Sequence, residues 1–342
     1  MEQYQDRARG MLVGLAVGDA LGATYEFGFS SERIRHLGDK ISTFQESVAY
    51  PAGAWTDDTS MALCIADSLL EKHGYNSYDI MYKFSLWMNE GYRAFDDQPA
   101  LDVGQQTATA INNYLAEPTI RKDAKKTESA GNGPIMRLAP IVIANTFPNQ
   151  NLDKTIKESE LGPLIDMAIL SCRETHNSIA AECVTEIFAT VLYSAIRGYE
   201  KKDIKHWHEK WNPHDNEYSH FWQKNTKYLI DRAFQDGEDL RDLGGYIVDA
   251  FAIALWSFIH SESFEDGMLK VIRLGGDTDT NAACYGQLAG AYYGYKAIPE
   301  KWRSKVCKAK ELVKLADDLL AMESCPILKT RFEDDEHFER IR

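Results

Sequence analysis

The stretch Leu274–Gly294 combines a sharp turn, a run of oxygen-bearing side chains and a helix of small residues. Its glycine pair, Gly275 and Gly276, allows the backbone to turn tightly or to adopt a positive φ. The run Asp277–Thr280 follows, and such side chains favour a helix N-terminus as caps and through the helix dipole. Alanine and glycine then recur through positions 282–291. This pattern predicts a helix that packs closely against other helices.

A second cluster of the same kind stands far earlier in the chain. Thr56, Asp57, Asp58 and Thr59 come directly before Met61–Leu70, an apolar run with helical spacing. One such cluster alone is explained by a helix N-terminus with several capping side chains. Two clusters of carboxylate and hydroxyl oxygens favour a shared ligand, and hard divalent cations prefer such oxygens.

Charge and composition exclude several classes of partner. The 342 residues include 38 Lys and Arg against 52 Asp and Glu, which gives a net charge of −14. An acidic surface disfavours nucleic acid and anionic membranes. Six cysteines without a C-x-x-C pair predict free thiols in a reducing compartment. The apolar run Met11–Ala23, which Asp19 interrupts, is shorter than the roughly 20 residues of a membrane span. We therefore expect a cytoplasmic protein.

Helical periodicity dominates the chain, and no alternating run of β-branched residues stands out. We expect one mostly α-helical domain over residues 1–342, with no parallel sheet. Gly14, Gly18 and Gly22 leave one helix face nearly bare and predict a close helix contact. Asp19 lies beside this stripe, and its role stays open. The predicted helices are Gln3–Leu21, Thr59–Lys72, Tyr78–Tyr92, Gln105–Leu115, Leu164–Thr175, Ser178–Arg197, Gly244–His260 and Lys301–Met322.

The remaining segments are expected to be variable. Residues 28–54 resemble a surface excursion, and residues 117–128 a charged linker. Residues 199–245 are rich in His and Trp; without a Cys partner or regular spacing, an inserted helix pair is favoured over a zinc site. The C-terminal part, about 300–342, is expected to end in a loosely held acidic tail.

Two further segments keep alternatives open. The loop Gly131–Gly133 lets a backbone approach a ligand closely, and free N–H groups there could hold phosphate. Plain turn chemistry is the simpler interpretation of that loop taken alone. His176 follows a helix and fits a cap or a core histidine equally well.

Taken together, several sequence blocks resemble the ADP-ribosylglycohydrolase family. They occur in the family's order and cover a core of about residues 8–295. The blocks are Gly14–Gly22 with Glu26, Thr56–Thr59, Asp102–Gly104, Gly131–Gly133 with Met136 and Arg137, Thr175 with His176, and Gly275–Thr280.

This resemblance implies an all-α, orthogonal helical fold with a cleft that binds two divalent cations, Mg²⁺ or Mn²⁺. It implies Asp102 and Glu26 as the catalytic acidic residues. The implied substrate-binding residues are Gly131, Asn132, Gly133, His176 and Gly275. The implied metal ligands are Thr56, Asp57, Asp58, Asp277, Asp279 and Thr280.

The function implied by the resemblance is hydrolysis of ADP-ribose from arginine on a modified protein. The modification would be regulatory or inflicted by a toxin, with a cognate ADP-ribosyltransferase or toxin as a further partner and immunity as a possible role. Two alternatives stay open: a hydrolase of serine-linked or O-acetyl ADP-ribose, and a catalytically silent binding protein on the same scaffold.

Overall fold

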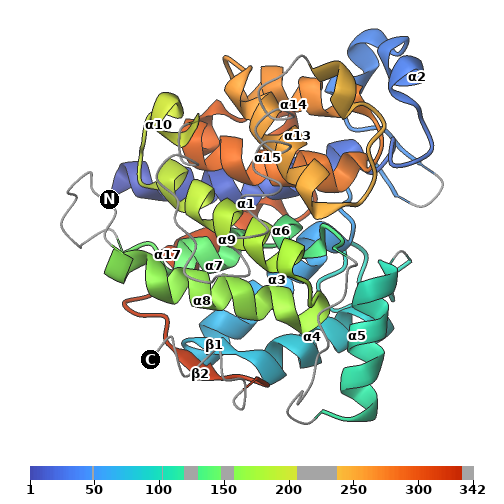
Figure 1. The fold of residues 1–342 in the computed structure, drawn as a ribbon. Coiled ribbons are helices and arrows are strands. Elements are labelled where there is room, and N and C mark those ends of the chain that lie inside the picture. The colour runs from blue at the N-terminus through green and yellow to red at the C-terminus, as the bar shows by residue number, and fades with distance from the viewer. Residues whose placement is uncertain (48–49, 102, 119–129, 148–157, 206–236, 333–342) are drawn as a thin grey trace.

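The structure, a computed structural model, describes residues 1–47, 50–101, 103–118, 130–147, 158–205 and 237–332 (Figure 1). The described chain is mostly helical, as predicted. Its longer helices are α1 (Glu2–Gly22), α3 (Asp57–Lys72), α4 (Ser77–Glu90), α5 (Gln105–Ala116), α8 (Glu158–Thr175), α9 (Ile179–Ile196), α13 (Ile247–Ile259), α14 (Phe264–Leu274), α15 (Thr278–Tyr293) and α17 (Ala309–Leu320).

Short elements connect these helices. They are the α-helices α2 (Ser31–Arg35), α6 (Gly133–Met136), α7 (Ala139–Ala144), α10 (Lys201–Lys205) and α16 (Glu300–Arg303), the 3-10 helices η1 (Gly38–Ser42), η2 (Gly237–Leu240) and η3 (Tyr295–Ala297), and the strands β1 (Tyr75–Asn76) and β2 (Ile327–Lys329).

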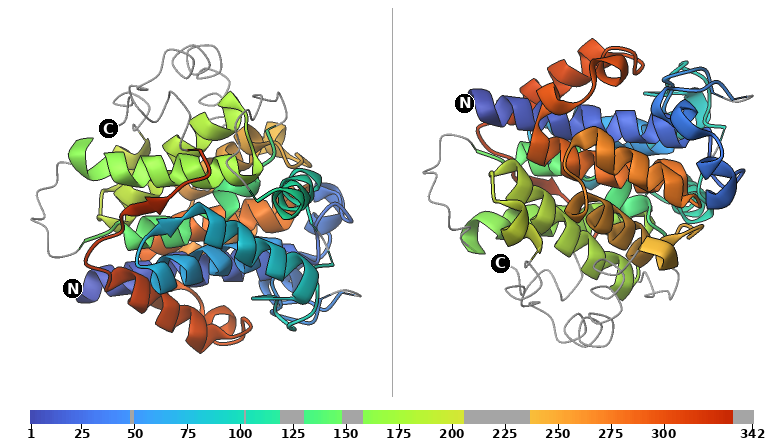
Figure 2. Two further views of the ribbon diagram at one scale, coloured as in Figure 1. Left: turned by 90° about the horizontal axis from the view of Figure 1, so that it is seen from below. Right: turned by 90° about the horizontal axis from the view of Figure 1, so that it is seen from above.

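The antiparallel pair α1 and α15 runs through the middle of the fold (Figures 1 and 2). A Cβ placed on Gly14 would lie 2.3 Å from the carbonyl oxygen of Gly286, and one on Gly18 would lie 2.0 Å from that of Ala282. The two backbones touch, so no side chain larger than hydrogen fits at these positions. The predicted close helix contact is confirmed, and its partner is the small-residue helix of the opening stretch.

Other helices cover this central pair. α9, α13 and α14 pack against α15, whereas α3 and α17 pack against α1. By length and composition α9 could cross a membrane, but 78% of its apolar window is buried inside the protein, as expected of a core helix. All six cysteines are free, as predicted.

One prediction for the C-terminal part was wrong, and another lies largely outside the described residues. The expected helix Lys301–Met322 is broken between α16 and α17, where Lys308 adopts a left-handed φ of 48°. The acidic residues 333–342 of the tail that was expected to be loosely held lie outside the described residues. Before them, β2 pairs in parallel with β1 and Phe332 is buried. This short parallel pair also contradicts the expectation of no parallel sheet; strands this short leave no periodic pattern in a sequence.

Of the segments expected to be variable, the surface excursion is largely within the described residues. Residues 28–54 contain α2 and η1, and Ile34 and Ile41 are buried, so this excursion is anchored to the core. The four histidines considered for zinc, at positions 206, 208, 214 and 220, lie outside the described residues, as does most of the charged linker.

Candidate functional site

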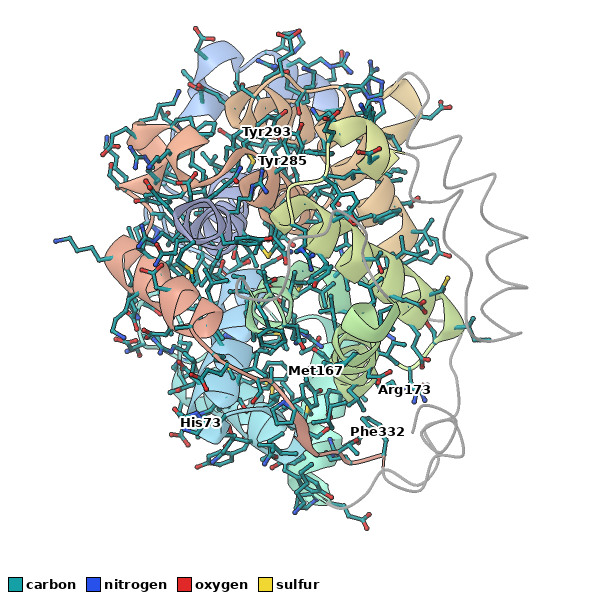
Figure 3. All side chains as sticks on the ribbon, turned by 90° about the vertical axis from the view of Figure 1, so that its left-hand side faces the viewer. His73, Met167, Arg173, Tyr285, Tyr293 and Phe332 are labelled. Carbon is teal, nitrogen blue, oxygen red and sulfur yellow. The ribbon has the colours of Figure 1, made fainter. Side chains whose placement is uncertain are left out.

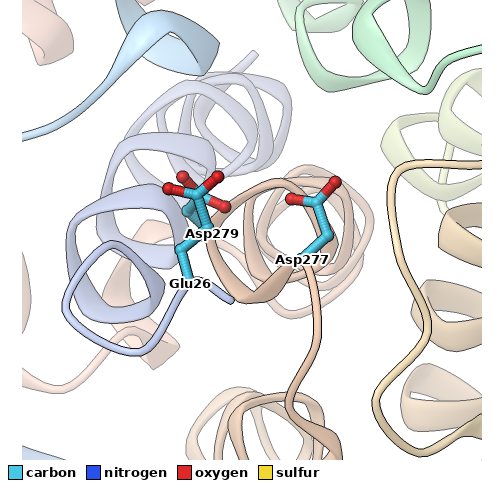
Figure 4. A group of neighbouring side chains, drawn as sticks. All are labelled: Glu26, Asp277 and Asp279. Carbon is cyan, nitrogen blue, oxygen red and sulfur yellow. The ribbon is translucent and has the colours of Figure 1, made fainter. Parts of the chain in front are cut away.

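The antiparallel pairing brings the end of α1 to the start of α15. A Cβ on Gly22 would lie 2.4 Å from the Cα of Asp279, so the last turn of α1 touches the first turn of α15. Glu26 follows α1 within a few residues. Glu26, Asp277 and Asp279 each place a carboxylate oxygen within 4.8 Å of the others (Figure 4). Of these three, Glu26 was predicted as catalytic rather than as a metal ligand.

Asp19, whose role the sequence left open, fixes the start of α3. Its Oδ1 accepts hydrogen bonds from the N and Oγ1 of Thr56, both at 2.9 Å. Its Oδ2 accepts from the N of Thr59 at 3.0 Å and from Oγ1 at 2.6 Å. A buried carboxylate on α1 therefore supplies the cap that α3 lacks from its own N-cap residue, Thr56.

One side chain joins the two oxygen-rich clusters. Asp58 Oδ2 lies 3.1 Å from Thr56 Oγ1, whose one proton it shares with Asp19, and accepts from Thr280 Oγ1 at 3.4 Å. The first contact stays within the Thr56–Asp58 cluster and the second reaches the Asp277–Thr280 cluster. The structure thus brings together two segments that the sequence separates by most of its length.

Burial and mutual repulsion of the carboxylates in this cluster favour a bound cation. Burial raises the pKa of Asp58 well above its ordinary value, and the nearby carboxylates of Asp19, Asp57 and Asp277 raise it further. Burial, followed by Glu26 and Asp58, raises the pKa of Asp279 in the same way. Among the described residues, Asp58 Oδ1 has no hydrogen-bond partner, although it is buried. Buried carboxylates of one sign are costly unless a cation offsets them, so the residues fit a hard divalent ion.

Asp57 and Thr56 line a small cavity whose lining also includes residues of the loop 94–101. Asp102, the other predicted catalytic residue, follows that loop in the sequence and lies outside the described residues.

The loop Gly131–Gly133 is tied to the acidic cluster. Asn132 Nδ2 donates to Asp277 Oδ2 at 2.9 Å, so the predicted substrate-binding amide is used to orient a predicted metal ligand. The N–H of Gly131 donates to Gln106 Oε1, and the N–H of Asn132 donates to the carbonyl of Gly245, both at 3.0 Å. These two N–H groups are engaged inside the protein rather than free for a phosphate.

Two other predicted substrate-binding residues, His176 and Gly275, make close contacts inside the protein. His176 is buried, and a Cβ on Gly131 or on Gly133 would lie 2.8 Å from an atom of its ring. Burial lowers the pKa of His176 to about 3, so the ring is neutral. Gly275 adopts a φ of 73°, and a Cβ there would lie 2.6 Å from Asp242 Oδ1. In this structure His176 shapes the loop and Gly275 permits a turn.

The comparisons with known proteins agree with this geometry. A family model described as ADP-ribosylglycohydrolase matches residues 1–326. The chain belongs to the ADP-ribosylglycohydrolase family. ADP-ribosylarginine hydrolase Tri1 of Pseudomonas putida (strain GB-1) is 32% identical to it, over 93% of this chain and 79% of the relative. ADP-ribosyl-[dinitrogen reductase] glycohydrolase of Rhodospirillum rubrum is 29% identical, over 93% and 96%.

A solved structure supports the same assignment. It is titled ADP-ribosylglycohydrolase-related protein complex, is 33% identical, and covers 94% of this chain and 99% of its own with a TM-score of 0.71. The predicted family, helical fold and enzyme class are thereby confirmed: this ADP-ribosylglycohydrolase is a hydrolase. Its cellular location stays a prediction, as does the division into core, insert and tail.

The sequence did not reveal the partners of several supporting residues. Asp19 stands out in the sequence as a carboxylate inside an apolar run, but its partners Thr56 and Thr59 could not be predicted. Gln106 carries no such signal, because amide side chains are ordinary on helix surfaces. In the sequence, Arg137 stands out only as part of the motif that contains Gly131–Gly133. In the structure it is fully buried and donates from Nη2 to Thr175 Oγ1 at 2.6 Å.

Proposed function

We propose that this chain is a divalent-metal-dependent hydrolase that removes ADP-ribose from arginine on modified proteins. The observation that carries the proposal is the single acidic cluster built from two helix starts, with Asp58 bonded to both. The arginine linkage is supported by the relatives named ADP-ribosylarginine hydrolase.

The proposed metal ligands are Thr56, Asp57, Asp58, Asp277, Asp279 and Thr280, and the position of Glu26 adds it as a seventh candidate. Bound Mg²⁺ or Mn²⁺ would orient ribose hydroxyls and a water and lower the pKa of that water. Asp19 holds Thr56, and Asn132 holds Asp277, so both halves of the ligand set are oriented before a cation arrives.

The remaining chemistry belongs to carboxylates and backbone. Departure of the leaving group builds oxocarbenium character at the ribose C1, which nearby negative charge stabilises. Asp102 or Glu26 is proposed to take a proton from the water that attacks C1, while the C1–N bond breaks and the departing guanidine takes up a proton. The loop Gly131–Gly133, which has little side chain, is proposed to let the ADP-ribose lie close against the backbone.

A panel of linkages tests the proposal directly. Purified protein is incubated with arginine-, serine- and O-acetyl-linked ADP-ribose, with Mg²⁺ or Mn²⁺ and with a chelator. We expect release of ADP-ribose from the arginine linkage, lost on chelation and lost in Asp58→Asn. Release from the serine or O-acetyl linkage alone would show that the substrate carries that linkage instead of arginine. No release from any linkage would favour a catalytically silent binding protein.

A further inference from the structure

The segment Cys325–Phe332 closes over one end of the helical fold. The N–H of Tyr75 donates to the carbonyl of Pro326 at 2.8 Å, which joins β2 to β1. Cys325 Sγ lies 3.8 Å from Met167 Sδ on α8. Phe332 lies at the far end of the segment (Figure 3). Its side chain is buried, with 4% exposed. This segment is therefore part of the packed structure beside α8.

Arg331 is the buried charge of this segment. Its Nη1 lies 3.4 Å from Glu174 Oε2, and the side chains are 6% and 0% exposed. The hydroxyl of Ser77 donates to the other oxygen of Glu174. The guanidinium also stacks on Tyr114 of α5, with Cζ 4.9 Å from the ring centroid. A buried ion pair contributes little net stability, so its best-attested use is to hold one arrangement among several.

The first route from Arg331 leads through α8 to the loop. Glu174 is followed directly by Thr175 and His176, at the C-terminal end of the helix. Thr175 Oγ1 and His176 Nδ1 are hydrogen-bonded at 2.8 Å. The ring of His176 then lies against Gly131 and Gly133 so closely that a Cβ on either would clash. A shift of Glu174 would therefore move the surface on which the loop rests.

The second route leads through α5 to the same loop. Tyr114 lies in the last turn of α5, and its hydroxyl donates to the carbonyl of Tyr78 at 3.2 Å. Gln106, in the first turn of α5, accepts the hydrogen bond from the N–H of Gly131. Arg331 thus contacts both elements that carry the two supports of this loop.

We propose that Arg331 is a positioning residue for ADP-ribose binding, which acts by locking α8 and α5 so that His176 and Gln106 hold the Gly131–Gly133 loop in its binding shape. The inference rests on the proposed function for one premise, that this loop binds ADP-ribose. It adds a residue on a segment remote in sequence from every predicted site residue.

A neighbouring ion pair provides a matched control. Arg173, next to Glu174 on α8, donates to Glu182 on α9 through Nε at 3.0 Å and Nη2 at 2.9 Å. This pair is as buried as Arg331–Glu174 but joins α8 to α9 instead of to the segment Cys325–Phe332. Arg173→Met therefore removes a buried charge from the same helix turn without touching Arg331.

The test measures the dissociation constant for ADP-ribose by calorimetry, and KM and kcat on a modified protein, in the full chain with divalent metal. Thermal melts first establish that each variant is folded at the assay temperature. Arg331→Met is expected to weaken ADP-ribose binding about tenfold, as supporting residues around a site commonly do. KM should rise while kcat stays unchanged, and Arg331→Lys should recover part of the affinity. Tyr114→Leu, which leaves both charges in place, should weaken binding in the same direction.

The outcomes separate cleanly. Weaker binding by Arg331→Met and Tyr114→Leu, with wild-type affinity in Arg173→Met, supports the inference. Wild-type affinity in folded Arg331→Met and Tyr114→Leu overturns it, as does equal weakening in Arg173→Met. If Arg331→Met does not fold, Tyr114→Leu alone decides in the same way. A wild-type chain that fails to bind ADP-ribose contradicts the proposed function itself and removes the premise.

Discussion

The two oxygen-rich clusters look alike in the sequence but are held in place by different physics. The Thr56–Asp58 cluster is positioned by hydrogen bonds that Thr56 and Thr59 donate to a single buried side chain, Asp19. The helix that carries the Asp277–Thr280 cluster is positioned by backbone contact between α15 and the glycine face of α1, and Asn132 orients the side chain of Asp277. Similar local sequences therefore predict similar ligands, but not similar sensitivity to mutation.

The two clusters should respond differently to mutation because their contacts differ in how far they can rearrange. A hydrogen-bonded cluster can survive a change that keeps donors and acceptors matched, because side chains have some freedom. A backbone–backbone contact has no side chain to rearrange, so any added atom must move a helix. The α15 cluster should thus be the more brittle of the two.

The largest expected effect is at the glycine face. Gly18→Val places atoms where even a Cβ would lie 2.0 Å from the Ala282 carbonyl oxygen. We expect a loss of about 3 kcal/mol or more in the free energy of unfolding, at the upper end of overpacking effects. Urea denaturation measures it, with Gly162→Ala in α8 as control, because a Cβ at Gly162 meets nothing within 4 Å. Equal free energies of unfolding for Gly18→Val and Gly162→Ala would contradict the expectation that the α15 cluster is the more brittle of the two.

A smaller effect is expected at Asp19. Asp19→Asn turns an amide group toward hydrogen-bond donors of Thr56 or Thr59, so at least one of them loses its acceptor. We expect catalytic efficiency to fall about 10- to 100-fold, with helix content unchanged. Steady-state kinetics and circular dichroism measure the two. Thr59→Ser, which keeps the hydroxyl, should stay close to wild type; an equally large loss there would show that packing, not hydrogen bonding, holds this cluster.

The smallest effect is expected at His176, whose ring packs against the glycines on both sides of Asn132. Burial lowers the pKa of His176 to about 3 from 6.5, so the unfolded chain binds a proton at acidic pH that the folded chain refuses. Stability is therefore lost as the pH falls below about 6.5. Between pH 7 and pH 5 this residue alone should cost about 2 kcal/mol of the free energy of unfolding. His176→Gln should flatten that pH dependence; an unchanged slope would show that other groups cause it.

Helical periodicity was sufficient to predict α1, α3, α5 and α9 close to their observed ends, and the small-residue pattern predicted the presence of α15 without its bounds. The metal-ligand candidates could be proposed because Asp and Thr cluster locally before two helices. The partners of those residues could not be predicted, because Asp19 with Thr59 and Asn132 with Asp277 are long-range pairs. The break at Lys308 also escaped, since the helical pattern on its two sides continues through a residue with a left-handed φ.

The central claim is that the two clusters form one cation site, and metal-linked stability tests it most directly. Thermal melts are recorded for wild type, Asp58→Asn and Asp279→Asn, with chelator and with Mg²⁺ or Mn²⁺. Each bound cation at 100 times its dissociation constant should stabilise the wild type by about 2.7 kcal/mol. Each variant should lose most of that gain, although Asp58 and Asp279 lie on different helices. A full wild-type gain in Asp58→Asn would contradict the claim, because the cation would then bind to the α15 cluster alone.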